Sequence, residues 1–352
     1  MSTDVSQLGY NTFPDILNNY SSADARAQFV IPARILDRMT PFIKMLPMVP
    51  SNNVLSNIAT RTDSLPVAST RRWNEGIKAT VSKNVPLSDP IALFEDYSEV
   101  DKDLWEIQNQ PNMWRSDQDM NHIEGLFQLI ESQLIYGNIG TLPGSINGFA
   151  TRFNNLESYP NGDSTWAVNV WNGGSTTAGS VTSAWMIEFG DDSVYGIYPS
   201  NTPAGLSLED LGQYTKQLGS GTTGSTGANY MYEVLGTLLT WYVGIQISDE
   251  RCVQRIANIN PVALGANNFD ENIFIQAKNW LPRAGEAPGT VILVNRALKT
   301  QIDIRAVSQK LNTYFTPPSD NSMDVFGKAV TKFQNIPIYV AEKILSTETV
   351  LT

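Results

Sequence analysis

Cysteine and histidine are almost missing from this chain of 352 residues, which has one of each, Cys252 and His122. A single cysteine allows no disulfide within the chain, so the sequence gives no sign of an oxidising compartment. A zinc site needs several Cys or His ligands, and one of each cannot supply them. Any Ser-His-Asp or Cys-His mechanism would have to use His122. It falls beside the apolar stripe of a predicted helix, where a surface or interface histidine is the simpler interpretation.

Motifs that bind phosphates or calcium are also missing. The chain has no GxxxxGK[ST] loop, no GxGxxG loop and no EF-hand spacing. The glycine-rich run GSGTTGSTG (219–227) follows no buried strand and ends without Lys-Ser/Thr, so we interpret it as a linker. The acidic pairs Glu95-Asp96 and Asp191-Asp192 are typical of a solvated face or turn. We therefore expect no catalytic residue, no cofactor and no metal site.

Charge is scarce and mostly negative. Charged residues make up 17% of the chain, below the roughly 25% of an average soluble domain, and the net charge is −11. A chain that buries much of its surface against neighbours needs less surface charge, although a β-rich fold with a Ser/Thr/Asn surface has the same composition. The negative balance argues against tight direct binding of nucleic acid, and it is compatible with a wall that encloses DNA without holding it.

Long apolar runs are missing as well. The N-terminus, MSTDVSQLGY, has no basic region followed by an apolar run, so we expect no signal peptide. No segment approaches 18 uninterrupted apolar residues, and we expect no membrane span. Hydrophobic residues nevertheless make up 41% of the chain, enough for a large core in one elaborate domain or two closely joined ones.

Residues 52–100 have the pattern of a long two-stranded excursion. NNVLSNIATRT (52–62) runs outward, VSKNVPLSDPIALFEDYSEVD (81–101) returns, and Asn74-Glu75-Gly76 supplies turn residues between them. Residues 52–85 carry five basic and two acidic residues, a charge of +3, whereas 86–107 carry one basic and seven acidic residues, −6. A basic tip on an acidic base suits a projection that contacts another subunit. A solvated hairpin with charge scattered by chance is the alternative.

Residues 116–137 give the clearest helical pattern. Ser116 can cap the helix, and Asp117 and Asp119 would lie in its first turn, where the helix dipole favours acids. Gly137 stands where a left-handed residue commonly ends a helix. The apolar stripe at spacings of three and four consists of Met120, Ile123, Phe127, Ile130 and Leu134.

The second half of the chain is β-rich and then becomes α/β. Residues 185–190 and 193–199 predict a hairpin around Gly190-Asp191-Asp192, and 241–260 predict two β segments joined by the polar corner Ser248-Asp249-Glu250. From Asn268 onward the pattern predicts helix, strand, helix and strand. Asp270 and Asn295 are expected to cap the two helices, which end near Pro282 and Lys310, and VILVN (291–295) and IPIYVAE (336–342) are the expected strands.

Five of these segments, in this order, resemble the major capsid proteins of tailed double-stranded-DNA bacteriophages. LPVASTRRWNEG (65–76) resembles the tip of that family's extended loop, and DQDMNHIEGLFQLIESQLIYGN (117–138), leading to NGFATRF (147–153), resembles its spine helix. WMIEFGDDSVYGIYPSNTPAGL (185–206) resembles its hairpin. The segments 241–260 and 268–307 complete the likeness. No single motif is a short decisive signature, so the resemblance rests on the order and separation of the five.

The resemblance implies an α+β capsid fold with four parts. They are an N-terminal arm (1–51) with a helical spacing of Ile35, Met39 and Phe42, an extended β-hairpin loop (52–108), a peripheral domain with a long spine helix (109–260), and an axial α/β domain with a returning C-terminal strand (261–352). It also implies self-assembly into hexamers and pentamers that form the icosahedral head shell of a virion. Assembly is expected in the host cytoplasm, around double-stranded DNA that is enclosed without specific binding.

Partners other than further copies of the chain are also implied by the resemblance. They are a separate scaffolding protein, a portal and, as a further candidate, a decoration protein. The scaffolding protein is expected to be separate because only about 50 residues precede the extended loop. Lys78 and Lys83 could supply amines for covalent cross-links, but no specific signal favours them and we expect none. The residues expected at contacts between subunits are Arg61, Arg71, Arg72, Trp73, Glu75, Lys78, Asp117 and Asp119.

Two other classes of protein stay open. A cellular nanocompartment shell of similar fold would also self-assemble, but would load enzyme cargo in place of a genome. A carbohydrate-binding β-protein would present Trp166, Trp171 and Trp185 on an exposed face, and would normally carry an export signal.

Overall fold

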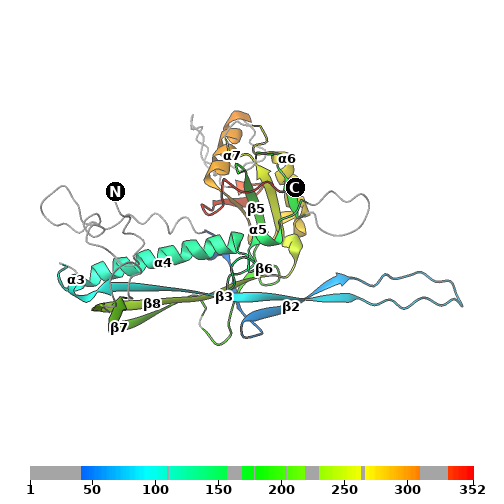
Figure 1. Ribbon diagram of the computed structural model, residues 1–352. Helices are drawn as coiled ribbons and strands as arrows, with labels where there is room; N and C mark the ends of the chain where they lie inside the picture. Colours follow the sequence, from blue (N-terminus) through cyan, green and yellow to red (C-terminus); the bar gives the residue numbers. More distant parts are fainter. Residues whose placement is uncertain are drawn as a thin grey trace. The chain divides into compact units, whose positions relative to one another are not determined.

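The computed structural model describes residues 41–108, 111–156, 169–177, 179–202, 204–218, 230–262, 266–309 and 332–352 (Figure 1). Five features expected from the sequence lie outside these ranges: Ile35, Met39, Trp166, the run 219–227 and the end of the second helix at Lys310. The chain divides into two compact units. Of the described residues, the first unit contains those within Leu93–Leu129 and Gly205–Trp241, and the second contains those within 41–92, Ile130–Ala204 and Tyr242–Thr352.

The strands form two six-stranded sheets. In one sheet the order is β1-β6-β8-β3-β2, with β7 pairing β8. Its strands are β1 (Met48–Pro50), β2 (Ser56–Ser64), β3 (Lys83–Asp101), β6 (Val194–Tyr198), β7 (Leu206–Leu218) and β8 (Tyr230–Ile247). In the other sheet the order is β11-β12-β10-β5-β9-β4. Its strands are β4 (Val170–Asn172), β5 (Thr182–Glu188), β9 (Val253–Ile259), β10 (Thr290–Val294), β11 (Lys332–Phe333) and β12 (Ile336–Val340).

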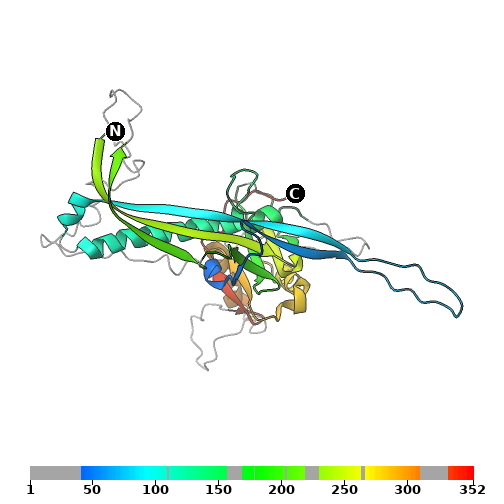
Figure 2. The same cartoon turned by 90° about the horizontal axis from the view of Figure 1, so that it is seen from below.

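The first unit contains a long antiparallel hairpin and the N-terminal part of a helix. Strands β7 and β8 pair from Leu206 opposite Trp241 to Leu218 opposite Tyr230, and they run side by side in Figure 2. Helix α3 (Lys102–Glu106) precedes α4 (Pro111–Tyr136). The ring of Phe127 on α4 meets Trp241 of β8 edge-on, with ring centroids 5.3 Å apart, so aromatic packing holds the helix to the hairpin.

The second unit contains the α/β sheet and its helices. Every residue of β5, β9 and β10 is buried, as expected of strands covered on both faces. Strand β10 pairs parallel with β12 and antiparallel with β5. Helices α6 (Glu271–Trp280) and α7 (Arg296–Gln309) contribute Phe274, Leu298 and Ile302 to a core shared with this sheet. The smaller helices α2 (Pro41–Met45) and α5 (Phe149–Arg152) also belong to this unit.

Local signals predicted this part of the chain well. The Asp270 side chain accepts a hydrogen bond from the N–H of Asn272 at the start of α6, and Asn295 accepts from the N–H of Leu298 at the start of α7. The strands expected at 291–295 and 336–342 are β10 and β12. The polar corner at 248–250 joins β8 to β9 as predicted, through a short 3-10 turn (Glu250–Cys252).

The predicted hairpin at 185–199 is wrong. A tight turn at 190–193 does join the two segments, since the N–H of Ser193 donates to Gly190 O at 3.1 Å. Beyond this turn, however, β5 pairs with β9 and β10, whereas β6 pairs with β1 and β8 in the other sheet. Pairing with distant strands therefore replaces the local pairing that the sequence suggested.

The expected limits of the long helix also need correction. Helix α4 begins at Pro111, five residues before Ser116. Proline is tolerated in a helix's first turn because the N–H it lacks would have no partner there, and the buried Trp114 extends the apolar side backward. Asp117 and Asp119 therefore lie beyond the first turn.

Gly137, which directly follows α4, does not have the left-handed conformation that we predicted, because its φ is not positive. Glycine is required there for another reason. A Cβ at this position would lie 2.4 Å from Gln133 O and 2.5 Å from Ile146 O. Of the expected apolar stripe, Ile130 and Leu134 are fully buried.

Candidate inter-subunit surface

The excursion between β2 and β3 is the most exposed part of the described chain (Figure 1). The two strands pair antiparallel from Ser56 opposite Pro90 to Ser64 opposite Lys83. Beyond this last pair the two arms continue without strand pairing to a turn at the tip, where the N–H of Glu75 donates to Arg72 O at 3.2 Å. Asn74 has a φ of 68°, a conformation that asparagine tolerates better than most residues. The expected two-stranded excursion and its turn are confirmed.

The basic and aromatic residues expected at subunit contacts lie at this tip. Trp73 is 93% exposed, and Arg71, Arg72, Glu75 and Lys78 are exposed as well. The Arg71 guanidinium donates to Glu75 O at 3.1 Å, which helps to fix the turn. A tryptophan in this position leaves a large apolar surface in water, and Trp and Arg are the residue types that most often dominate protein interfaces.

The remaining expected contact residues lie elsewhere. Arg61 lies within β2, opposite Val85. Asp117 is buried, at 9% exposure, and Asp119 is half-buried and accepts a hydrogen bond from Thr237 Oγ1 at 3.3 Å. These two acids are thus less accessible to another subunit than the exposed Glu95, Asp103 and Glu106 of the 89–106 cluster.

The base of the excursion is held by a buried polar cluster that sequence reasoning missed. Asn57 and Asp89 face each other across β2 and β3, and both are buried. Arg152 donates to Asp89 Oδ1 at 2.7 Å and also to the backbone carbonyls of Asn147 and Ile245, at 2.9 and 3.2 Å. The excursion therefore has a fixed base and an uncovered distal part. The segment NGFATRF was noticed in the sequence, but nothing local indicated that its arginine reaches residue 89.

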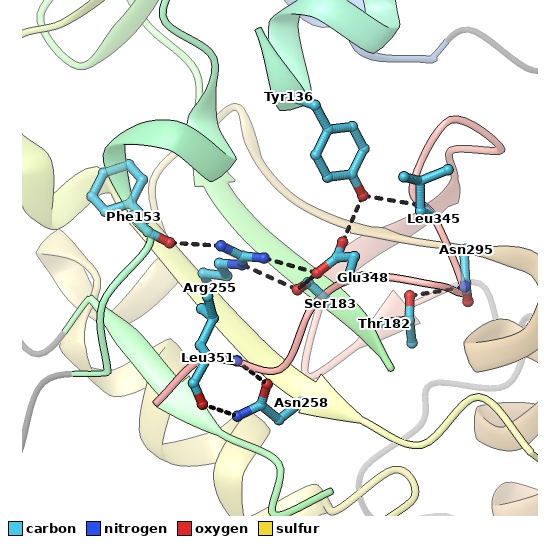
Figure 3. Close-up of polar contacts among 10 residues, drawn as sticks. All are labelled: Tyr136, Phe153, Thr182, Ser183, Arg255, Asn258, Asn295, Leu345, Glu348 and Leu351. Carbon is cyan, nitrogen blue, oxygen red and sulfur yellow. Dashed lines mark hydrogen bonds and ion pairs between the residues drawn. The ribbon is translucent and has the colours of Figure 1, made fainter. Parts of the chain in front are cut away.

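A second buried ion pair ties the C-terminal segment to the α/β sheet (Figure 3). Arg255 on β9 contacts Glu348 at 2.8 Å, and the two side chains are 4% and 5% exposed. Arg255 also donates to Phe153 O at 2.7 Å and to Ser183 Oγ at 3.0 Å. Tyr136, one residue before Gly137, donates to the other carboxylate oxygen at 2.5 Å.

Burial, and then the adjacent Glu348 carboxylate, raise the pKa of Tyr136 far above its usual value, so the tyrosine stays a proton donor. The polar side chains named in this cluster hydrogen-bond to one another or to the backbone, and Arg255 and Glu348 lie in the interior. Its arrangement suits a structural tie. Because Glu348 lies 93 residues from Arg255, no spacing in the sequence could have indicated the pair.

The single histidine of the chain lies beside a surface carboxylate. His122 Nδ1 lies 2.7 Å from Asp96 Oδ2, a pair on the surface of the first unit. Within the described ranges no group of three or more His, Cys, Asp or Glu side chains is placed to hold a metal ion. None of the helices described is both long and apolar enough to cross a membrane.

The burial of Trp171 and Trp185 contradicts the carbohydrate-binding alternative, which needs them on an exposed face. Trp171 is 9% exposed and Trp185 is 2% exposed, so neither is available to stack on a sugar. The guanidinium of Arg255 lies over the Trp185 ring, 4.9 Å from its centroid. Trp166, the third residue of that hypothesis, lies outside the described residues.

The fold is that of a bacteriophage capsid protein. A solved structure of bacteriophage Epsilon15 is similar, with a TM-score of 0.63, 19% sequence identity and 97% of each chain covered. The bacteriophage JBD30 capsid has a TM-score of 0.47 at 12% identity over 94% of this chain and 99% of that one. An encapsulin from Synechococcus elongatus scores 0.40 at 11% identity, covering 67% of this chain and 93% of that one.

The family model described as major capsid protein GP7 matches residues 24–352. The chain therefore belongs to the major capsid protein GP7 family, and the resemblance seen in the sequence is confirmed. No curated protein matches it. The family is one of structural capsid proteins.

Proposed function

We propose that copies of this chain assemble as hexamers and pentamers into the icosahedral head shell that encloses a phage genome. Membership of the major capsid protein family supports the shell. The observation that supports the mode of contact is the uncovered excursion, with a 93% exposed tryptophan at its tip and a fixed base. A two-stranded ribbon is marginally stable alone in water, so it needs a surface to lie on.

The parts of the fold have proposed roles within this shell. Helix α4 is the spine helix of a peripheral domain (109–260), and the chain from 261 onward supplies the axial domain. The α/β sheet takes strands from both sides of residue 260, since β4, β5 and β9 precede it. The axial region therefore includes strands from the earlier part as well.

Other partners follow from the same proposal. They are a separate scaffolding protein, a portal, and a decoration protein as a further candidate, with assembly in the host cytoplasm. With a net charge of −11, the wall encloses double-stranded DNA without binding it specifically. We propose neither catalytic activity nor covalent cross-links through Lys78 or Lys83.

The test is the size of the purified chain, expressed with and without the phage's other head proteins. We expect hexamers, pentamers or closed shells by sedimentation and negative-stain microscopy. A chain that stays strictly monomeric in both cases would overturn the proposal. Shells that load enzymes in place of DNA would support the nanocompartment class instead.

A further inference from the structure

The segment 341–352, which follows β12, is held by side-chain contacts and not by secondary structure. It forms no helix or strand, and its ladder contact is an isolated bridge between Glu348 and Val181. Few of its N–H groups therefore belong to a cooperative element, so opening it requires less free energy than opening a sheet. We call this segment the C-terminal strap.

The C-terminal strap has a buried side and an exposed side. Ala341, Ile344 and Glu348 are at most 6% exposed. Most of the other residues are exposed; they are Glu342, Leu345, Ser346, Thr347, Thr349 and Thr352. A carboxylate is thus one of the groups that the strap buries.

This carboxylate connects the sheet to the end of α4 (Figure 3). One oxygen of Glu348 accepts from Arg255 on β9 at 2.8 Å and from the Ser183 hydroxyl on β5 at 2.5 Å. The other accepts from the hydroxyl of Tyr136, the last residue of α4, at 2.5 Å. That hydroxyl also accepts from the N–H of Leu345 at 2.9 Å. The end of α4 therefore contacts the strap through both a side chain and a backbone group of the strap.

Further contacts hold the strap on either side of Glu348. The Asn258 side chain exchanges two hydrogen bonds, both 2.9 Å, with the backbone of Leu351, and Asn295 donates to Ser346 Oγ at 3.0 Å. Neutral hydrogen bonds of this kind are readily exchanged for bonds to water. Removing Glu348 from Arg255 is harder, because the guanidinium would keep its charge at 4% exposure. The carboxylate is therefore the group that decides whether the strap stays closed.

We infer that the C-terminal strap is a reversible closure on the end of α4, held shut by Glu348. With the strap closed, one carboxylate serves Arg255, Ser183 and Tyr136 together. With it open, the Tyr136 hydroxyl loses both of its partners in the strap, and the last turn of α4 opens more often as a result. Helix α4 extends from the first unit into the second, so the strap acts on a helix that both units share.

Two substitutions of the same type on the strap test this. Glu348→Gln removes the buried charge, and Glu342→Gln removes an exposed one that pairs with Arg296 at the surface. The measurement is hydrogen–deuterium exchange of the unassembled chain, followed for the strap and for the last turn of α4. We expect Glu348→Gln to speed exchange in both segments by at least about tenfold, and Glu342→Gln to leave both within about threefold.

A second variant, Tyr136→Phe, serves if Glu348→Gln does not fold, because it leaves the ion pair in place and removes the hydroxyl alone. It should speed exchange in the strap and in the last turn of α4 together, by at least about fivefold. The β7–β8 hairpin, which lies in the first unit, should exchange as in wild type.

Four outcomes would overturn the inference. They are faster exchange in the strap alone, no change in either segment, equal effects of Glu348→Gln and Glu342→Gln, and an equal acceleration in the β7–β8 hairpin, which would mean general destabilisation.

Discussion

The burial of Glu131 on α4 predicts that the stability of the chain depends on pH. The Glu131 side chain is 0% exposed. Burial raises its pKa to about 7, and the backbone N–H of Phe42 and the charge of Lys343 offset only part of that effect. Because the folded chain binds this proton more tightly than the unfolded chain, the contribution to stability is complete below about pH 4.5. It is lost as pH rises through about 7.

Glu131→Gln should therefore stabilise the chain at pH 8 and have little effect at pH 5. At pH 8 the variant no longer buries a charge, and we expect a gain of about 1–3 kcal/mol in the free energy of unfolding. Urea unfolding at both pH values measures it. The control is Glu95→Gln, which changes an exposed acid on β3. A variant no more stable than wild type at pH 8 would contradict the assignment.

At the scale of the element, the end of α4 is fixed by how closely another backbone segment approaches it. Gly137 donates its N–H to Gln133 O at 2.8 Å, and its carbonyl accepts from the N–H of Gly148 at 2.9 Å. A Cβ at residue 137 has no room between the carbonyls of Gln133 and Ile146. Glycine there serves close packing of two backbones.

Gly137→Ala should consequently cost more than about 1 kcal/mol of stability, since backbone carbonyls cannot move away as a flexible side chain can. Thermal unfolding of the unassembled chain measures the loss. Gly125→Ala, within α4, is the control, because a Cβ there meets no atom within 4 Å. It should stabilise by about 0.5–1 kcal/mol, as alanine favours a helix interior over glycine. Equal effects at the two positions would refute this account of the helix end.

Elements with local signals were predictable from the sequence, and those that depend on distant partners were not. The caps Asp270 and Asn295 are each within three residues of the N–H groups that they bind, so their pattern is visible in the sequence. Strand β5 could not be placed in the same way. Its turn with β6 suggested a hairpin, but its partners lie 66 (Ile187 to Val253) to 108 (Trp185 to Leu293) residues away.

In the candidate inter-subunit surface, too, the features with local signals were predictable and those that depend on distant residues were not. The exposure of Arg71, Arg72 and Trp73 followed from a turn signal and local composition, and the structure places all three at the tip as expected. The Arg152–Asp89 pair that holds the base could not be found, because 63 residues separate the two side chains.

At the scale of the whole molecule, the basic tip is proposed to contact acids of another copy. Arginine pairs with carboxylates in two-pronged geometry, and the exposed Trp73 adds apolar area to such a contact. Partly exposed ion pairs are screened over about 8 Å at physiological ionic strength, so assembly should weaken as salt rises.

Replacing Arg71 and Arg72 by Glu should block shell formation and leave the unassembled chain folded. Sedimentation measures assembly across a salt series, and circular dichroism checks the fold. Lys44→Glu, which changes a basic residue on α2 outside the excursion, is the control. Normal shells from the double variant, with the salt dependence of wild type, would remove the tip from the contact.

The one-residue irregularity in β2 sets the orientation of everything beyond it. The ladder shifts between Thr62 and Ser64, while β3 continues without interruption. An extra residue on one strand reverses the direction of all later side chains on that strand. The extra residue at position 63 therefore decides on which side of the ribbon the later side chains of this strand lie. Without it, Leu65 and Val67 would fall opposite Val81 and Ala79, and Pro66, Ala68 and Thr70 would move to the side of Lys78. The side of the distal ribbon on which each side chain lies is thus set by backbone geometry near its origin.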